Sequence, residues 1–234
     1  MPRSPQGHPL VIQAGQSGRG RRFAAQWGEA IFTSNPSVEA SIANYKELKA
    51  DAAAHGRDPD HMLLCSLCHP VVAETRAEAE DKFAFIETLP MLEDSLMLLS
   101  ENNNFDFGAK GIDEPFTKEE LDSMSGSQGG KDRVLLAIKD RMPTPRDFIT
   151  ITRRGKLPPP WVGSAKEVAD IFEDWFTRRA CDGFVVGAAS VPTSYEDFGR
   201  LVVPELQRRG LFQKDYAGTT LRENLGLPIP RVER

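Results

Sequence analysis

Short apolar runs alternate along the chain with longer segments in which apolar residues recur every three or four positions. The first runs are LVIQAG, EAIFTS and MLLCSLCHPVVA, which have the length and residue types of buried strands. Helical periodicity follows each run, and in the second such segment one stripe holds Val38, Ile42, Tyr45, Leu48 and Ala52. A third helix is predicted from around Thr75 towards Leu89, where Pro90 should end it.

The same alternation returns after a long interruption. Between about Glu101 and Pro160 the chain is polar and rich in glycine, and the run KLPPPW is predicted to be extended. We expect this stretch to be an excursion that does not belong to the core of the fold. Beyond it, Ser164 and Glu167 form a capping box, which predicts a helix that ends near Cys181.

A strand and a helix complete the pattern. The short run DGFVVG is predicted to be a buried strand. The last helix should open at Ser194 with Asp197 and stop at Gly210.

This order of elements indicates an α/β fold with parallel strands joined by right-handed crossovers. Four strands of this kind form either an open sheet or half of an eight-stranded barrel. Composition and periodicity do not distinguish these two architectures.

Composition and charge exclude several classes of partner. The formal net charge is −5, so a broad attraction to nucleic acid is not expected. No apolar stretch is long enough to span a membrane, and the first ten residues lack the apolar core of a secretory signal. We therefore expect a cytoplasmic protein in which Cys65, Cys68 and Cys181 are thiols.

The segment QAGQSGRGRRFAAQ, residues 13–26, holds the clearest candidate chemistry. A strand end that runs through Gly15, Ser17, Gly18 and Gly20 into a helix leaves backbone N–H groups free to bind an anion such as phosphate. Nearby arginines would strengthen the local positive field. The alternative is a tight turn and helix cap without a ligand. The segment matches neither the Walker loop nor the dinucleotide-binding glycine fingerprint.

Three longer segments carry a family resemblance. HPLVIQAGQSGRGRRFAAQWGEAIFT, VGSAKEVADIFEDWFTRRACDGFVV and VVPELQRRGLFQKDYAGTTLRENLGLPIP resemble the nitrilotriacetate and dibenzothiophene-sulfone monooxygenase (component A) group of the bacterial luciferase-like flavin-dependent monooxygenase superfamily. The resemblance covers most of the chain except residues 101–150. It corresponds to the C-terminal half of the family fold.

The resemblance implies a partial (β/α)8 TIM barrel that contains the last four strands and helices, with a long insertion before the last helix and strand. Residues 1–234 would then be a single luciferase-like domain, with an insertion and possible lid at residues 101–160 and a C-terminal tail at residues 211–234. A lid and a solvated surface loop are both compatible with the insertion. The implied cofactor is FMN, with its phosphate on Gln16, Ser17 and Gly18.

The resemblance also implies the partners and the reaction. A separate NAD(P)H-dependent flavin reductase would supply reduced flavin, and O2 would oxidise a small organic substrate. The first four strands, which in the family carry flavin-ring and substrate contacts, have no counterpart here. We therefore expect a homo-oligomer or a complementary half barrel, with weak FMN binding by this chain alone. The alternative is a catalytically inert module, either truncated or one subunit of a split barrel, that binds flavin or serves assembly. Neither interpretation identifies a catalytic residue.

Other candidate sites compete with this interpretation. Cys65-Ser66-Leu67-Cys68-His69 has the spacing of a c-type haem attachment motif, but it lies inside an apolar strand and lacks further metal ligands nearby. No metal site is predicted. His69 near the end of a strand suits either an acid–base role or a structural one, and Asp182 is expected to be a turn residue.

Overall fold

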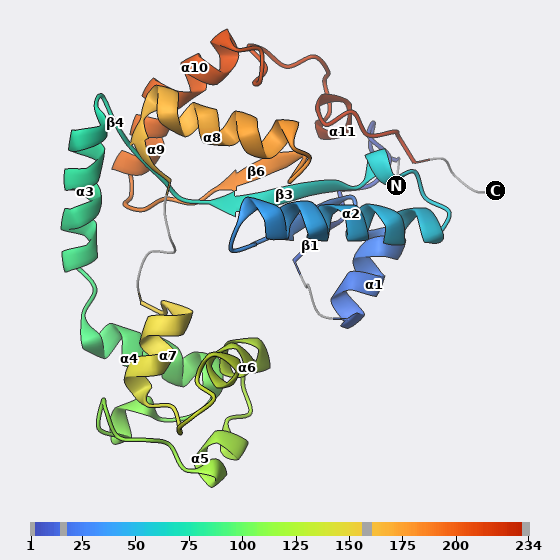
Figure 1. The fold of residues 1–234 in the computed structure, drawn as a ribbon. Helices are drawn as coiled ribbons and strands as arrows, with labels where there is room; N and C mark the ends of the chain where they lie inside the picture. The colour runs from blue at the N-terminus through green and yellow to red at the C-terminus, as the bar shows by residue number, and fades with distance from the viewer. Residues whose placement is uncertain (1–2, 15–17, 156–160, 231–234) are drawn as a thin grey trace. The chain divides into compact units, whose positions relative to one another are not determined.

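The computed structural model describes residues 3–14, 18–155 and 161–230. The chain divides into two compact units (Figure 1). Unit 1 contains Met1–Ala79 and Trp161–Arg234, and unit 2 contains Glu80–Pro160. Among the described residues, no helix is both long and apolar enough to traverse a lipid bilayer.

A parallel four-stranded sheet is the centre of unit 1. Its strands are β1 (Ile12–Gln13), β2 (Ala30–Thr33), β3 (Leu63–Cys68) and β6 (Gly183–Val186), in the order β1-β2-β3-β6. Every neighbouring pair is parallel, which confirms the predicted α/β class. Within the described residues these strands form an open sheet and do not close into a barrel.

Helices connect these strands in the predicted alternation. α1 (Gly18–Trp27) follows β1, and α2 (Val38–Ala54) follows β2. α2 begins there because the Ser37 side chain accepts a hydrogen bond from the backbone N–H of Ala40. The 3₁₀ turn η1 (Pro59–His61) leads into β3.

A second, two-stranded parallel sheet joins the two halves of unit 1. β4 (Pro70–Ala73) pairs with β5 (Trp161–Ser164), a strand that the sequence did not predict. The capping box of Ser164 and Glu167 is confirmed at the start of α8 (Ala165–Thr177), which ends four residues before Cys181. The proline run at residues 158–160 lies outside the described residues.

The predicted last helix is a continuous helical segment of three parts. These are α9 (Thr193–Asp197), the π-helical η3 (Phe198–Val202) and α10 (Val203–Arg208). The predicted cap by Ser194 and Asp197 is wrong, because the helix starts earlier and Ser194 Oγ accepts from the Ser190 N–H instead. The stop at Gly210 is confirmed, since this residue has a φ of +73°.

One face of the four-stranded sheet is covered by helices. The side chains of Ile31 and Leu64 pack with α1 and α2 in one core cluster. Cys68, Phe184 and Val186 point to the same side and pack in a second cluster with α8 and the C-terminal helices. The helix layer therefore spans the sheet from β2 to β6.

The opposite sheet face, called the open face below, belongs to neither cluster. It is formed by the alternate strand positions Ile12, Ala30, Phe32, Leu63, Cys65, Leu67, Gly183 and Val185. Ile12 is 67% exposed and Val185 is 37% exposed. Parallel sheets normally bury both faces, so this face is an unusual apolar surface.

Unit 2 is helical and has a core of its own. It contains the end of α3 (Arg76–Thr88) and then α4 (Leu92–Asn103), η2 (Phe107–Ala109), α5 (Lys118–Ser123), α6 (Gln128–Ala137) and α7 (Pro145–Thr152). α3 ends before Pro90, as predicted. Phe107, Phe116 and Phe148 pack edge to face at the centre of unit 2, with ring centroids 5.1–5.4 Å apart.

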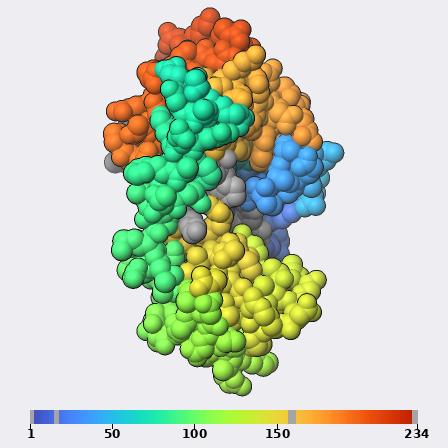
Figure 2. Space-filling model, turned by 60° about the vertical axis from the view of Figure 1, so that its left-hand side comes forward, coloured from blue at the N-terminus to red at the C-terminus, as the bar shows by residue number. Residues whose placement is uncertain are grey.

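The stretch expected to be an excursion therefore has a core of its own, which the sequence pattern did not predict. The buried cluster also includes Leu99, Leu121, Met124 and Val134, and the green and yellow side chains of unit 2 pack into one mass (Figure 2). The glycine-rich and polar composition concealed it, because the apolar residues are spread over several short helices with no long periodic segment.

Candidate functional site

The carboxyl edge of the four-stranded sheet is the candidate functional site. β1, β2, β3 and β6 end there at Gln13, Thr33, Cys68 and Val186. In α/β folds, ligands bind beyond the carboxyl ends of parallel strands, where the following loops and helix N-termini converge. The segment predicted to hold phosphate follows β1 at this edge.

The N-terminus of α1 is open to solvent. Gly18 is its first residue, and a Cβ placed there would meet only the Arg22 Nη1 atom, at 3.9 Å. The first turn contains no acidic residue. Backbone N–H groups at the start of a helix lack intrahelical partners, and the helix dipole favours an anion beside them. Gln16 and Ser17, the other two predicted phosphate contacts, lie outside the described residues.

Only some of the neighbouring arginines are available to such an anion. Arg21 donates from Nε to Asp51 Oδ2 at 2.6 Å and from Nη1 to Glu47 Oε2 at 2.8 Å, so it joins α1 to α2. The hydrogen bonds that Arg21 donates to Asp51 and, to a lesser extent, to Glu47 raise the pKa of Arg21 above its ordinary value. Arg19 and Arg22 have no ion-pair partner among the described residues. Of the three nearby arginines, Arg19 and Arg22 therefore supply the positive charge at this helix start that is unpaired within the described ranges.

A buried hydroxyl network supports the carboxyl half of β2 and β3. Thr33 Oγ1 lies 3.2 Å from Ser66 Oγ, and Ser41 Oγ lies 3.4 Å from the same Ser66 oxygen. Ser41 also donates to the carbonyl of Ala180 at 2.8 Å and accepts from Asn35 Nδ2 at 3.1 Å. This network ties the start of α2 to the sheet. The sequence pattern does not predict this network, and its only local signal is a polar Ser66 within an apolar strand.

His69 lies at the carboxyl end of β3. It continues the alternation of Cys65 and Leu67, which places its side chain on the open face. A Cβ built on Gly187, the residue after β6, would lie 2.6 Å from His69 Nε2. The imidazole therefore lies directly against the Gly187 backbone.

The haem-like motif is split by the pleat of the strand. Cys65 lies on the open face and Cys68 on the helix-covered face, because residues three apart in a strand point to opposite sides. Burial raises the pKa of Cys65 and raises the pKa of Cys68 to about 12. All three cysteines are free thiols. Within the described ranges, no group of three or more His, Cys, Asp or Glu residues is arranged to hold a metal ion.

The amino edge of the sheet has a structural polar centre. Asp182 accepts from the Leu64 N–H at 2.9 Å and from Tyr45 Oη at 2.8 Å, and its Oδ2 lies 3.0 Å from Lys49 Nζ. Asp182 is thus more than the predicted turn residue. It joins α2, β3 and the start of β6 at the end of the sheet opposite to the candidate site.

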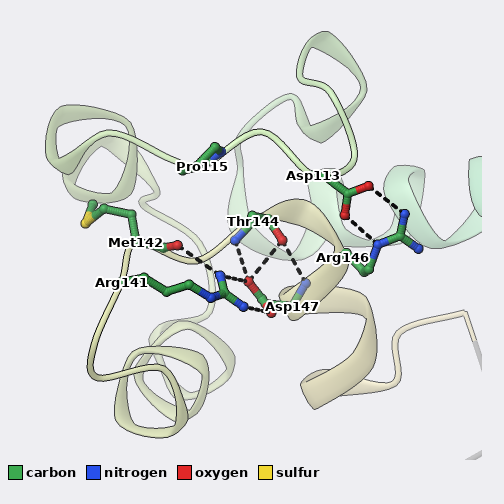
Figure 3. A pocket seen from close by; sticks show the side chains of 7 residues that line it. All are labelled: Asp113, Pro115, Arg141, Met142, Thr144, Arg146 and Asp147. Carbon is green, nitrogen blue, oxygen red and sulfur yellow. Dashed lines mark hydrogen bonds and ion pairs between the residues drawn. The ribbon is translucent and has the colours of Figure 1, made fainter.

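Unit 2 has a separate surface pocket of about 520 Å3 (Figure 3). Two arginines line it, but each is held by an aspartate. Arg141 contacts both carboxylate oxygens of Asp147 at 2.6 and 2.7 Å, and Arg146 contacts both of Asp113 at 2.6 and 2.8 Å. The pocket therefore offers an anionic ligand no unpaired cation from these side chains.

Comparisons with known proteins agree with the architecture of unit 1. The family described as Luciferase-like monooxygenase matches residues 1–176. The chain is 35% identical to dibenzothiophene-sulfone monooxygenase of Rhodococcus erythropolis, over 100% of this chain and 52% of that protein. It is 34% identical to nitrilotriacetate monooxygenase component A of Aminobacter aminovorans, over 99% and 51% respectively.

A solved structure shows the same relation. The crystal structure of DmoA from Hyphomicrobium sulfonivorans superposes with a TM-score of 0.75 at 32% identity, over 95% of this chain and 46% of that one. With its parallel strands and the match over residues 1–176, the chain belongs to the luciferase-like monooxygenase family. It spans about half the length of the curated relatives it matches, a span consistent with their C-terminal half.

Proposed function

We propose that this chain is the C-terminal half of an FMN-dependent monooxygenase component. The reaction would use reduced flavin from a separate NAD(P)H-dependent reductase and O2 to oxidise a small organic substrate. The observation that carries the proposal is the alignment of the whole chain with half of relatives that are named monooxygenases. The free cysteines support a reducing cytoplasm as the location.

The described residues fit an FMN phosphate at the start of α1. The Gly18 backbone is unobstructed, no carboxylate lies in the first turn, and Arg19 and Arg22 add positive charge. In the proposed site, Gln16, Ser17 and Gly18 bind the phosphate, with Gln16 contributing its backbone. When bound, the flavin supplies the oxygen chemistry, while the protein binds it, orients it and excludes water.

The open face supports the proposal that four further strands complete a barrel. The open face is apolar, with Ile12 and Val185 exposed, and the sheet ends in the edge strands β1 and β6. A second parallel half barrel would cover this face and pair with these edges, and the remaining length of the relatives is enough to provide one. We expect the isolated chain to self-associate, most simply as a dimer. Light scattering tests this, and a stable monomer with one cooperative unfolding transition would contradict it.

Residues 101–160, which lie within unit 2, are proposed to act as a lid. The independent core of unit 2 supports a unit that moves as a whole, and such insertions often close over barrel sites. Addition of FMN and substrate should then slow proteolysis of residues 101–160. Unchanged cleavage would remove the lid from the proposal.

The direct test is an FMN titration followed by quenching of flavin fluorescence. Ser17→Ala removes one hydrogen bond to a charged phosphate, so its Kd should rise about tenfold. Ser127→Ala is the matched control, because Ser127 also precedes a helix but makes no side-chain cap hydrogen bond. Equal affinities for wild type and Ser17→Ala would contradict the proposed phosphate site.

Turnover distinguishes the enzyme from the alternative of an inert module. We expect no monooxygenation by this chain alone with reductase, reduced nicotinamide and O2, and we expect activity once the complementary half is added. Lack of activity in the reconstituted barrel, despite FMN binding, would favour the inert module. The Rhodococcus erythropolis and Aminobacter aminovorans relatives are both named monooxygenases, which supports the enzyme.

A further inference from the structure

The open face has one polar ring at its carboxyl end, that of His69. The strand positions below it are apolar or glycine, and they include Phe32, Leu67 and Val185. Two independent observations place the His69 ring on this face: the alternation of side chains along β3, and the short distance from the ring to the position of a Cβ built on Gly187. Cys68 and Val186 are register partners, and the Gly187 N–H donates to the Cys68 carbonyl at 2.8 Å. Residues 69 and 187 therefore form the next step of the same ladder.

The His69 side chain is available for a ligand. No hydrogen bond or ion pair engages its imidazole within the part of the chain that the structure describes. The ring is half-buried, and burial lowers the pKa of His69 below its ordinary value of 6.5. At neutral pH it is an uncharged imidazole with one N–H donor and one acceptor nitrogen, neither of which is used by the described residues.

We propose that His69 is a binding residue for the ring system of FMN. The inference rests on the proposed phosphate site at the start of α1. In the sheet order, β3 lies two strands from β1, which corresponds to about 10 Å across the strands. The ribityl chain separates the two ends of FMN by a comparable distance. A phosphate at α1 therefore brings the polar edge of the flavin ring within reach of the imidazole.

Gly187 gives His69 its position. A side chain at residue 187 would occupy the space of the imidazole, since its Cβ would lie 2.6 Å from Nε2 and 2.7 Å from Cδ2. Gly187 has no positive φ, so an alanine there displaces the ring without straining the backbone. Gly187→Ala thus moves the imidazole and leaves its chemistry intact.

Affinity and chemical protection together test the proposal on the chain as it exists. FMN titrations up to millimolar concentration compare wild type with His69→Gln and Gly187→Ala. We expect a Kd about threefold to tenfold higher for both, the effect of one lost or misplaced hydrogen bond. His61→Gln is the matched control at the amino end of the same strand, and it should bind FMN as wild type does.

Protection of the wild-type protein needs no variant. Diethyl pyrocarbonate acylates neutral imidazoles, and peptide mass spectrometry reports each histidine separately. In the dark, FMN should protect His69 and leave the labelling of His55 and His61 unchanged. This readout stays valid if a substitution at residue 69 prevents folding.

The outcomes separate this proposal from the one it rests on. Suppose that Ser17→Ala weakens FMN binding, but FMN does not protect His69 and His69→Gln binds FMN with wild-type affinity. This result overturns the role of His69 and leaves the phosphate site in place. Absence of FMN binding at millimolar concentration overturns the phosphate site, and the His69 contact with it. Protection of His69 together with weaker binding by both variants supports both.

Discussion

Removal of Glu29 should expose how strongly the C-terminal tail stabilises unit 1. Arg222, in the short helix α11 (Leu221–Asn224), is 0% exposed. Its Nη1 and Nη2 atoms contact the two carboxylate oxygens of Glu29 at 2.6 and 2.7 Å. Glu29 also accepts from the Val11 N–H at 3.0 Å, immediately before β1. Glu29→Ala would leave the buried guanidinium without its counter-charge.

The expected loss is large on the scale of the whole protein. Breaking a buried ion pair by removing one partner costs about 3–5 kcal/mol. Total stabilities of domains are about 5–15 kcal/mol, and each kcal/mol shifts Tm by about 2–4 °C at this size. The Tm of unit 1 should therefore fall by about 6–20 °C. Replacing both partners, in Glu29→Gln with Arg222→Met, should cost less than Glu29→Ala because no buried charge remains unpaired.

Tryptophan fluorescence is the appropriate probe. Trp27, Trp161 and Trp175 all lie in unit 1, so urea unfolding followed by their emission reports this unit without a contribution from unit 2. A loss below about 1 kcal/mol for Glu29→Ala would refute the reasoning, because an exposed pair is worth no more than that.

The same pair predicts a direction of pH dependence. Burial raises the pKa of Glu29, but hydrogen bonds from Arg222 and the Val11 N–H outweigh it, and the pKa lies below its ordinary value of 4.5. The group therefore contributes stability above about pH 4.5, and this contribution is lost as the pH falls through the lowered pKa. In Arg222→Met, the emission-monitored stability should depend less on pH in this acidic range.

Three further predictions concern single side chains. Tyr45→Phe removes the hydroxyl that donates to Asp182, so unit 1 should lose about 0.5–1.5 kcal/mol by the same fluorescence assay; an unchanged urea midpoint would contradict this. Hydrogen bonds, of which the one from Arg141 has the largest effect, hold the pKa of Asp147 at about 2. Ionised Asp147 therefore stabilises unit 2 fully above about pH 3.8, and this contribution declines as the pH falls towards 2. Circular dichroism should show less acid sensitivity in Asp147→Asn. Phe148→Ala creates a cavity in the core of unit 2 and should cost about 3–5 kcal/mol, and a loss below 1 kcal/mol would mean that the site collapses around it.

Local sequence signals were sufficient for most of unit 1. Apolar runs and helical stripes have different periods, and caps such as Ser164 with Glu167 act within a few residues, so the pattern contains them. They were insufficient for β5, which is extended because it pairs with β4, a partner about 90 residues earlier in the chain. The core of unit 2 was missed for the same reason, since its three phenylalanines come from separate short segments.

Local sequence also predicted only part of the candidate site. The glycines and serine after the first strand predicted an anion site, and Gly18 is accessible at the start of α1. The nearby arginines were expected to strengthen the positive field at that site, but Arg21 is bound by Asp51 and Glu47 from α2. No local pattern specifies which charges the neighbouring helix presents.

The sequence by itself determined the alternation of strands and helices, the parallel class of the sheet and the family, because these depend on periodicity and on residues close together in the chain. Only the tertiary structure decided which sheet face is open, that His69 lies against Gly187, and that Arg222 is buried on Glu29. These features join residues more than 100 positions apart. Their energies come from burial and pairing between distant segments, which no short window of sequence contains.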